Sequence, residues 1–233
     1  MWAFLVYAIL QSHYNIYMII IGDVHGCLFS LQELLRKVKH FSEPICFVGD
    51  LIDRGPHSKQ VVDIAMKHDC VKGNHEDLLV HEQEDIFPGS CSRYHIVHME
   101  NGGYETYTSF GGKISDEHMK YFQQMPAYKF YNNIKVDGKP LLVSHSFAGS
   151  CSLHDDHSLM WNRWFYINEE IYPNSDVPFF NVFGHTPVDN VLIRNCYAMI
   201  DTGCVFKKKL SAVRIVDGMS HKDIEVYDVL HCD

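Results

Sequence analysis

The N-terminal part of the chain alternates between short apolar runs and stretches whose apolar side chains recur every three or four positions. Runs rich in β-branched residues are typical of buried strands, whereas the spaced pattern is typical of amphipathic helices. We predict strands at residues 16–21, 45–48 and 70–72, and helices at 29–41, at 57–67 and from 74 onward. Ser30 is a candidate N-cap for the first helix. The β-α-β-α-β order predicts an α/β fold with a mostly parallel sheet and right-handed crossovers.

The pattern changes twice in the rest of the chain. Residues 82–133 are rich in His, Tyr, Gly and Met and have weak periodicity, so we interpret them as a mostly helical insert. Apolar runs then return and predict further strands, at 141–143, 179–183, 197–200, 210–216 and 224–229. The last two flank Asp217-Gly218 and are expected to form an antiparallel pair. We therefore predict that residues 1–233 form a single domain with this insert.

Charge and cysteine content narrow the range of partners. The formal net charge of −9 disfavours duplex nucleic acid, so we expect no nucleic-acid partner, and a phosphorylated substrate would need a local positive site. The eight cysteines form no C-x-x-C pair, and we expect free thiols in a reducing cytoplasm. Cys27 and Cys204 are expected to be buried. Residues 1–10 are apolar but too short to span a bilayer and lack a basic start, so we expect no membrane partner.

Polar residues follow five of the predicted strands at the point where each strand ends. Asp23, Asp50 and Asn74 follow strands of the first half of the chain, and His145 and His185 follow strands of the second half. In open α/β sheets, ligands bind outside the carboxyl ends of the strands. We therefore expect these five side chains to meet at one edge of the sheet.

The first three of these positions have side chains that suit metal binding. Asp23 and His25 are two residues apart and point to the same side of extended backbone, so both can reach one cation. Gly22 and Gly26 allow tight backbone turns on either side. The two carboxylate oxygens of Asp50 allow it to bridge two cations.

Neighbouring residues carry other chemistry. Asn74 offers a neutral oxygen ligand. Arg54 is suited to bidentate binding of phosphate oxygens, although an isolated Arg is as often a surface ion-pair partner. An imidazole suits proton donation to a leaving oxygen, so His75 is a candidate general acid, and Asp53 is placed to hold it in one tautomer. Glu76 is interpreted as a first-turn helix residue favoured by the helix dipole.

These motifs together resemble the PPP-type metallophosphatases within the calcineurin-like metallophosphoesterases, most closely the bacteriophage-lambda type of serine/threonine phosphatase. The matching segments are GDVHG at 22–26, GDLIDRG at 49–55, GNHE at 73–76, SHS at 144–146, WNR at 161–163, GHTP at 184–187 and IDTGCVF at 200–206. Asn101-Gly102-Gly103 is similar to a short motif of the lambda-type insert. The likeness spans residues 18–216 and implies the metallophosphoesterase fold, with central mixed β-sheets flanked by helices.

The resemblance also implies roles for individual residues. The implied metal ligands are Asp23 and His25 at the first metal, Asp50 between both metals, and Asn74, His145 and His185 at the second. The implied catalytic residues are His75 and Asp53, which donate the proton, and Arg54 and Arg163, which bind the phosphoryl oxygens. Oxygen and nitrogen ligands without thiolate suit two Mn²⁺ ions, with Fe or Zn as alternatives. Two ions about 3.5–4 Å apart would supply a bridging hydroxide for in-line attack.

Three functions are compatible with these motifs. We expect a monomeric protein phosphatase that hydrolyses phosphoserine and phosphothreonine, with phosphotyrosine as a further candidate, in a phosphorylated protein or peptide. The alternative is a hydrolase of dinucleoside polyphosphates such as diadenosine tetraphosphate. Asp53 and Glu76 favour the phosphatase, because the family resemblance implies that symmetrical diadenosine tetraphosphatases lack the acidic residue matching Asp53 and carry Asp rather than Glu after GNH. A catalytically silent binding protein is disfavoured, because every expected ligand position is filled.

Overall fold

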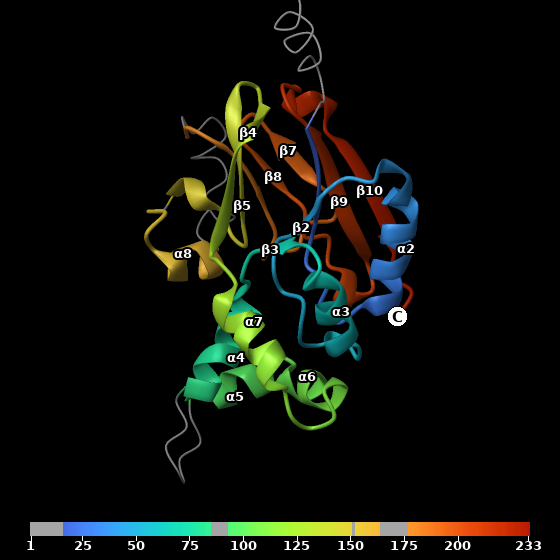
Figure 1. The fold of residues 1–233 in the computed structure, drawn as a ribbon, viewed down its shortest axis with the longest axis vertical. Helices are drawn as coiled ribbons and strands as arrows, with labels where there is room; N and C mark the ends of the chain where they lie inside the picture. Colours follow the sequence, from blue (N-terminus) through green and yellow to red (C-terminus); the bar gives the residue numbers. More distant parts are fainter. Residues whose placement is uncertain (1–15, 85–92, 151, 164–176) are drawn as a thin grey trace, which may run out of the picture.

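The computed structural model describes residues 16–84, 93–150, 152–163 and 177–233, and the apolar residues 1–10, Cys91 and Cys151 lie outside this description. Two five-stranded mixed β-sheets form the centre of the described molecule, with helices on their outer faces (Figure 1). The strand order is β10-β9-β1-β2-β3 in the first sheet and β4-β5-β6-β8-β7 in the second. The predicted α/β metallophosphoesterase fold with mixed sheets is therefore confirmed.

The first sheet is built around three parallel strands from the N-terminal part of the chain. Its strands are β1 (Tyr17–Ile21), β2 (Ile45–Phe47), β3 (Asp69–Cys70), β9 (Lys209–Val216) and β10 (Glu225–Leu230). β1 pairs in parallel with β2, and β2 with β3, as the βαβ pattern predicted. β9 is antiparallel to both β1 and β10, so the C-terminal strands complete a sheet that the N-terminal strands begin.

The second sheet comes from the C-terminal half and also contains parallel strands. Its strands are β4 (Tyr128–Val136), β5 (Lys139–Ser144), β6 (Phe180–Phe183), β7 (Leu192–Arg194) and β8 (Tyr197–Met199). β5, β6 and β8 run parallel, whereas β4 and β7 pair antiparallel at the two edges. The edge strands β4 and β7 were not predicted, because their apolar residues alternate with polar ones over short or partly exposed stretches.

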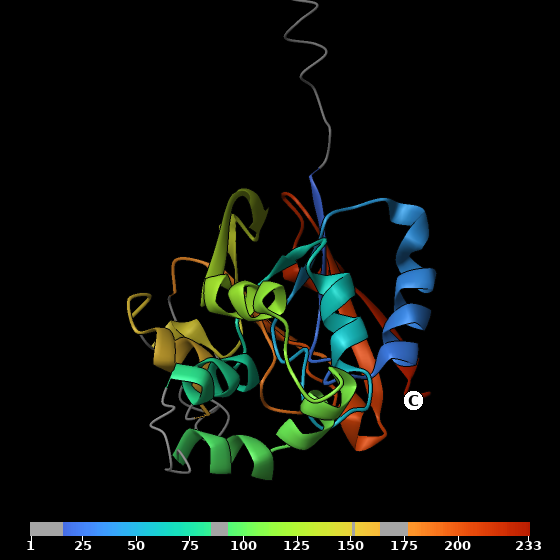
Figure 2. The same cartoon turned by 60° about the horizontal axis from the view of Figure 1, so that its bottom comes forward.

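Helices surround the two sheets and form most of the described part of the predicted 82–133 insert, whose last residues instead begin strand β4. The helices are α2 (Leu28–Val38), α3 (Ser58–Ala65), α4 (Asn74–Glu84), α5 (Arg93–Glu100), α6 (Gly103–Ser109), α7 (Asp116–Gln124) and α8 (Asp156–Trp161). Single 3₁₀ turns are η1 (Lys39–Phe41), η2 (Ala148–Ser150), η4 (Cys204–Phe206) and η5 (His221–Asp223). Helices α4 to α7 gather at one end of the sheets, which comes forward in Figure 2. None of the described helices is long and apolar enough to cross a bilayer.

Apolar burial explains why strand β1 lies at the centre. Ile19 and Ile21 face the core beneath α2 and α3, whereas Met18 and Ile20 face the second sheet. A strand covered on both faces needs apolar residues at every position, which is why the sequence shows a continuous run there. The outer face of the second sheet is covered by a third apolar cluster that includes Leu159 of α8.

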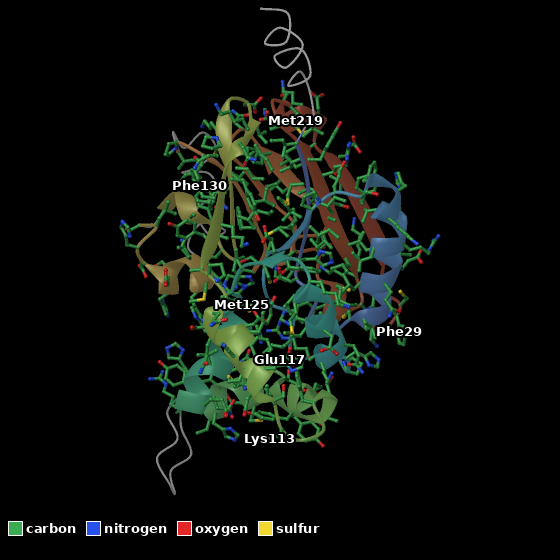
Figure 3. The ribbon with its side chains drawn as sticks, viewed as in Figure 1. Phe29, Lys113, Glu117, Met125, Phe130 and Met219 are labelled. Carbon is green, nitrogen blue, oxygen red and sulfur yellow. The ribbon has the colours of Figure 1, made fainter. Side chains whose placement is uncertain are left out.

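The start of helix α2 differs from the prediction. Ser30 does not cap this helix but lies inside its first turn, and Cys27 stands at the N-cap position without a capping hydrogen bond from its side chain. The backbone N–H groups of Phe29 and Ser30 instead donate to the carboxylate of Asp233, at 2.8 and 3.0 Å. Phe29, labelled in Figure 3, marks this turn. The cap comes from the far end of the chain, so no local sequence pattern could reveal it.

Candidate metal centre

Seven of the predicted site residues are brought together in one buried cluster. They follow the carboxyl ends of β1, β2, β3, β5 and β6 and are Asp23, His25, Asp50, Asn74, His75, His145 and His185. Each is at most 5% exposed to solvent. The expected convergence at one edge therefore occurs, and it joins strands of both sheets.

Asp50 lies at the centre of this cluster. Its carboxylate oxygen Oδ2 is 3.4 Å from Nε2 of His25, 3.3 Å from Nε2 of His145 and 4.0 Å from Nε2 of His75. Burial alone would raise the pKa of Asp50, but the imidazoles of His145 and His75 hold it well below its usual range. Asp50 belongs to two groups of potential metal ligands, one with His25 and His75 and one with His145 and His185.

Three potential metal-ligand atoms face one another on the second side of Asp50. Nε2 of His145 lies 3.0 Å from Oδ1 of Asn74 and 3.1 Å from Nδ1 of His185, and the latter two atoms are 2.8 Å apart. Nδ1 of His145 contacts the carbonyl of Val48 at 2.8 Å, which leaves Nε2 without a proton in the neutral ring. Lone pairs that converge in this way are stable when a cation lies between them.

The first side of Asp50 has a similar arrangement. Nδ1 of His25 donates to the Ile52 carbonyl at 2.7 Å, so Nε2 presents its lone pair. Burial, together with the nearby charges of His75 and Arg54, lowers the pKa of His25 to about 3, which keeps the ring neutral. A neutral imidazole whose second nitrogen is held by a carbonyl is the usual form of a metal-binding histidine.

The carboxylates of the cluster carry more negative charge than the protein itself offsets. Burial, Asp201 and Asp50 raise the pKa of Asp23 well above its usual range. Burial and Asp50 likewise raise the pKa of Asp201 to about 6. Nε2 of His185 is buried and has no hydrogen-bond partner among the described residues. Burial lowers the pKa of His145, but Asp50 and Asp23 raise it to about 9, so without a metal a proton on this ring offsets part of the negative charge. Divalent cations would replace that proton and offset the remaining repulsion among the carboxylates.

Glu76 makes more contacts than its interpretation as a first-turn helix residue implied. It does lie in the first turn of α4, but its buried carboxylate also accepts backbone hydrogen bonds from the loop after β2. The donors are the N–H groups of Asp50, Leu51 and Ile52, at 2.9, 2.8 and 3.3 Å, and of Gly73 at 2.9 Å. One side chain therefore fixes the Asp50 loop against the Asn74 loop.

A chain of buried hydrogen bonds runs outward from His75, first to the predicted Asp53 and then to residues that the sequence did not single out. Nδ1 of His75 lies 2.6 Å from Asp53, and the other oxygen of Asp53 lies 2.9 Å from His98. His98 continues to Glu82 at 2.5 Å, and Thr106 donates to Asp53 at 2.5 Å. Helix α5 has weak amphipathic character, so its sequence did not indicate that His98 belongs to this site. The neighbouring Asn101-Gly102-Gly103 motif was the one indication that the segment contributes to it.

Backbone strain is concentrated in the loops that carry the cluster. His25, Asp50, Asp53, Arg54 and His185 all have positive φ, between 46° and 71°. Such conformations cost free energy in non-glycine residues and persist where the surrounding structure determines them. These residues follow the ends of strands, and their backbone conformation directs the side chains toward the same buried cluster.

Two glycines permit the loops to approach one another. A Cβ atom at Gly184 would lie 1.9 Å from an oxygen of Asp23, and one at Gly49, where φ is +94°, would lie 2.5 Å from the Gly73 nitrogen. Gly26 has a positive φ, as the turn prediction required, whereas Gly22 is needed because the Ile200 carbonyl would be 2.5 Å from its Cβ.

The two arginines of the motifs lie on opposite sides of the cluster. Arg54 extends its guanidinium to Nε2 of His25 at 2.8 Å and lies over the ring of Phe206 at 5.5 Å. Arg163 is exposed, and its charge is close enough to His185 to contribute, after burial and His145, to lowering the pKa of that ring. Positive groups therefore flank the buried cluster on both the His25 side and the His185 side.

We predict that Glu76→Gln lowers the free energy of unfolding by about 1–3 kcal/mol, because an amide leaves backbone donors of the Asp50 loop unpaired. Urea unfolding measures this change. Glu117→Gln on helix α7, labelled in Figure 3, is the matched control, because Glu117 is exposed in a first helical turn. Equal unfolding midpoints for the two variants would contradict the role of Glu76.

We also predict that the stabilising effect of His98 declines from neutral to alkaline pH. Burial alone lowers the pKa of His98, but Asp53 and Glu82 raise it from 6.5 to about 9. A raised pKa stabilises the fold fully below pH 6.5, and the gain is lost as the pH rises through 9. The difference in urea midpoint between the wild type and His98→Asn should therefore shrink over this range. A difference independent of pH would contradict the charged state of His98.

Comparison with known proteins places this site in a family. Residues 16–210 match the model for calcineurin-like phosphoesterases. The chain is 28% identical to the asymmetrical bis(5'-nucleosyl)-tetraphosphatase PrpE of Anoxybacillus flavithermus, over 84% of this chain and 89% of the relative. It is 30% identical to the protein of the same name from Oceanobacillus iheyensis, over 84% of this chain and 87% of the relative.

Solved structures support the fold. The crystal structure of a presumed diadenosine tetraphosphatase matches with a TM-score of 0.64 and 20% identity, covering 95% of this chain and 96% of that chain. A protein serine/threonine phosphatase from Saccharomyces cerevisiae with similarity to human phosphatase PP5 matches with a TM-score of 0.63 and 14% identity, covering 96% and 82%. These nearly equal scores show a shared fold and do not separate the two activities.

The prediction of a serine/threonine protein phosphatase is wrong, because the curated relatives that cover most of the chain are named bis(5'-nucleosyl)-tetraphosphatases. That prediction relied on Asp53 and Glu76. The contacts explain the error: Asp53 bonds His75 and Glu76 bonds loop backbone, so both support phosphate chemistry whatever group departs. With its fold, its clustered ligands and the match over residues 16–210, the chain belongs to the calcineurin-like phosphoesterase family of hydrolases, whose members use a dinuclear metal site.

Proposed function

We propose that this protein hydrolyses dinucleoside polyphosphates of the diadenosine tetraphosphate type. The names of the curated relatives support this activity. Within the structure, an aromatic cavity next to the candidate metal centre carries the proposal, because a nucleotide substrate presents bases that stack on such rings. The lambda-type motifs supply the groups proposed to act on the phosphate. The residues that would select the substrate lie mostly outside these motifs.

The proposed metal ligands are the clustered residues after the strand ends. Asp23 and His25 would hold one ion, Asp50 would bridge both, and the second ion would be held by Asn74, His145 and His185. Hard oxygen ligands combined with imidazoles suit Mn²⁺. When bound, the two ions activate water near neutral pH and neutralise charge on the phosphoryl group.

The remaining site residues would act on the phosphate and on the leaving group. Arg54 and Arg163 would bind phosphoryl oxygens from the two sides of the cluster and stabilise the charge that develops there. His75 would donate a proton to the departing oxygen, while Asp53 at 2.6 Å holds its Nδ1 and thereby directs Nε2 toward the site.

Charge also favours a polyphosphate substrate. Two dications would outweigh the carboxylates of Asp23 and Asp50, and Arg54 and Arg163 add further positive charge. The site would therefore be locally positive on a chain whose formal net charge is −9. A linear polyphosphate has the dense negative charge that such a site attracts.

The aromatic cavity has a volume of about 370 Å³ and lies between helices α4, α5 and α8. Four rings line it: the His81 and Tyr94 rings lie 5.0 Å apart, and the His157 and Trp161 rings stack in parallel at 5.9 Å. Met125, labelled in Figure 3, also lines it. Lys72, Asp77 and Asp156 also line the cavity, so it combines flat rings for stacking with polar groups for hydrogen bonding, as a purine base requires.

Residues on both walls of the cavity are connected through helix α4 to the candidate metal ligand Asn74, at which this helix begins. Trp161 of α8 donates from its indole to Asp77, which lies three residues after Asn74 in α4. The other wall residue, His81, is seven residues after Asn74 on the same helix, or about 10 Å along its axis.

Hydrogen bonds connect helix α8 to Ser146, next to the candidate metal ligand His145 that follows strand β5. The backbone N–H and the hydroxyl of Ser146, which follows His145, donate to the carbonyls of Leu159 and Ser158, both at 2.8 Å. A base in the cavity would therefore be separated from the metals by a distance that a short polyphosphate chain spans.

We predict that Tyr94→Ala raises KM for diadenosine tetraphosphate about tenfold, because base stacking contributes roughly 1–3 kcal/mol. The same variant should leave kcat/KM for p-nitrophenyl phosphate unchanged, and Tyr94→Phe, which keeps the ring, should preserve both. Steady-state kinetics with Mn²⁺ supplied measures all three proteins. Loss of both activities in Tyr94→Ala would contradict the base-binding role. A wild-type protein that hydrolyses a phosphopeptide more efficiently than diadenosine tetraphosphate would contradict the proposed function.

A further inference from the structure

A second group of potential metal ligands lies outside the candidate catalytic centre. The thiols of Cys27 and Cys204 and a ring nitrogen of His231 all lie within 4.8 Å of one another. Both thiols are almost fully buried, at 1% and 2% exposure, and belong to the apolar core beneath α2. Neither cysteine is part of a disulfide. We refer to Cys27, Cys204 and His231 as the thiol–imidazole cluster.

Long-range contacts hold this cluster together. The C-terminal residues pack against the start of α2, next to the point marked C in Figure 1, where the carboxylate of Asp233 accepts the helix N–H groups. The backbone N–H of Cys232 donates to the hydroxyl of Ser30 at 3.1 Å, and the N–H of His231 donates to the Lys208 carbonyl at 2.9 Å. The imidazole is thereby fixed over the two thiols.

Two observations at the cluster indicate a ligand. Nδ1 of His231 is buried without a hydrogen-bond partner in the described residues. Hydrogen bonds from Cys27, and further ones from Ser30 and His231, lower the pKa of the Cys204 thiol to about 7, although burial opposes this shift. The same contact with Cys204, together with burial, raises the pKa of the Cys27 thiol, so without a metal the pair carries one thiolate. A thiolate is therefore available near neutral pH in a place from which water is largely excluded.

We propose that Cys27, Cys204 and His231 bind one soft divalent cation, with Zn²⁺ as the best fit. Cysteine thiolates and histidine imidazoles are the usual ligands of structural zinc sites, which have four protein ligands, so this set of three leaves one position for a further donor. Cys232 offers a further thiol at the edge of the cluster, with its sulfur 3.6 Å from the Ser30 hydroxyl. The catalytic ligands contain only oxygen and nitrogen, so the two sites would select different metals.

An ion bound at the thiol–imidazole cluster would link three segments that are far apart in the sequence. Cys27 comes two residues after His25, Cys204 comes three residues after Asp201, and His231 belongs to the C-terminal segment. A bound cation would connect these three segments behind the catalytic cluster. Because it would bind the folded chain, it would also stabilise the fold and release thiol protons on binding.

Cobalt substitution distinguishes this site from the catalytic one. The fully reduced wild-type protein, loaded with Co²⁺, should show a thiolate-to-cobalt charge-transfer band in the near ultraviolet, because the catalytic ligands include no sulfur. Cys204→Ala should abolish the band, and His231→Ala should weaken and shift it. Cys196→Ala, which removes a buried cysteine from the other sheet, should leave it unchanged. Zinc analysis should find one ion per chain fewer in Cys204→Ala than in this control.

Several outcomes would overturn the proposal. Absence of the band in reduced wild-type protein would do so, as would its persistence in folded Cys204→Ala. Should Cys204→Ala fail to fold, an unaltered band in His231→Ala would overturn it instead. Recovery of a Cys27–Cys204 disulfide, with no cobalt band after reduction, would assign the pair to redox chemistry. None of these readouts depends on the substrate of the enzyme.

Discussion

The carboxylate of Asp50 is buried against three imidazoles, with His145, His25 and His75 at 3.3, 3.4 and 4.0 Å, and the rest of the site depends on this contact. Charged groups are costly to bury unless partners offset them. Asp50 follows a strand of the first sheet, whereas His145 follows a strand of the second. The contact therefore exists only when both halves of the chain have folded together, with the two sheets packed against each other through a shared apolar cluster.

Around this centre, a layer of uncharged backbone contacts and buried acids holds the loops in strained conformations. Glu76 binds four backbone N–H groups from two loops, and Asp53 links His75 to His98. These groups prepare the site for phosphate chemistry in general. The choice of substrate then falls to surfaces farther out, which is why the cavity beside Trp161 carries the proposed nucleotide specificity.

The sequence predicted much of the fold and the whole central cluster, because strand periodicity and the position of Asp23, Asp50 and His145 after apolar runs are local signals. It did not reveal His98, whose partners Asp53 and Glu82 are 45 and 16 residues away. Nor did it reveal that Asp233 caps α2, since that contact spans 204 residues. The substrate prediction was wrong because it relied on Asp53 and Glu76, whose contacts are with His75 and with loop backbone.

Electron paramagnetic resonance of the Mn²⁺-loaded protein tests the central claim most directly, namely that Asp50 joins two metal sites into one centre. Two ions that share a carboxylate are coupled by exchange, so the account predicts a coupled dinuclear spectrum when two equivalents are bound. In Asp50→Asn this spectrum should disappear. A wild-type spectrum composed only of isolated Mn²⁺ ions would contradict the bridging role of Asp50.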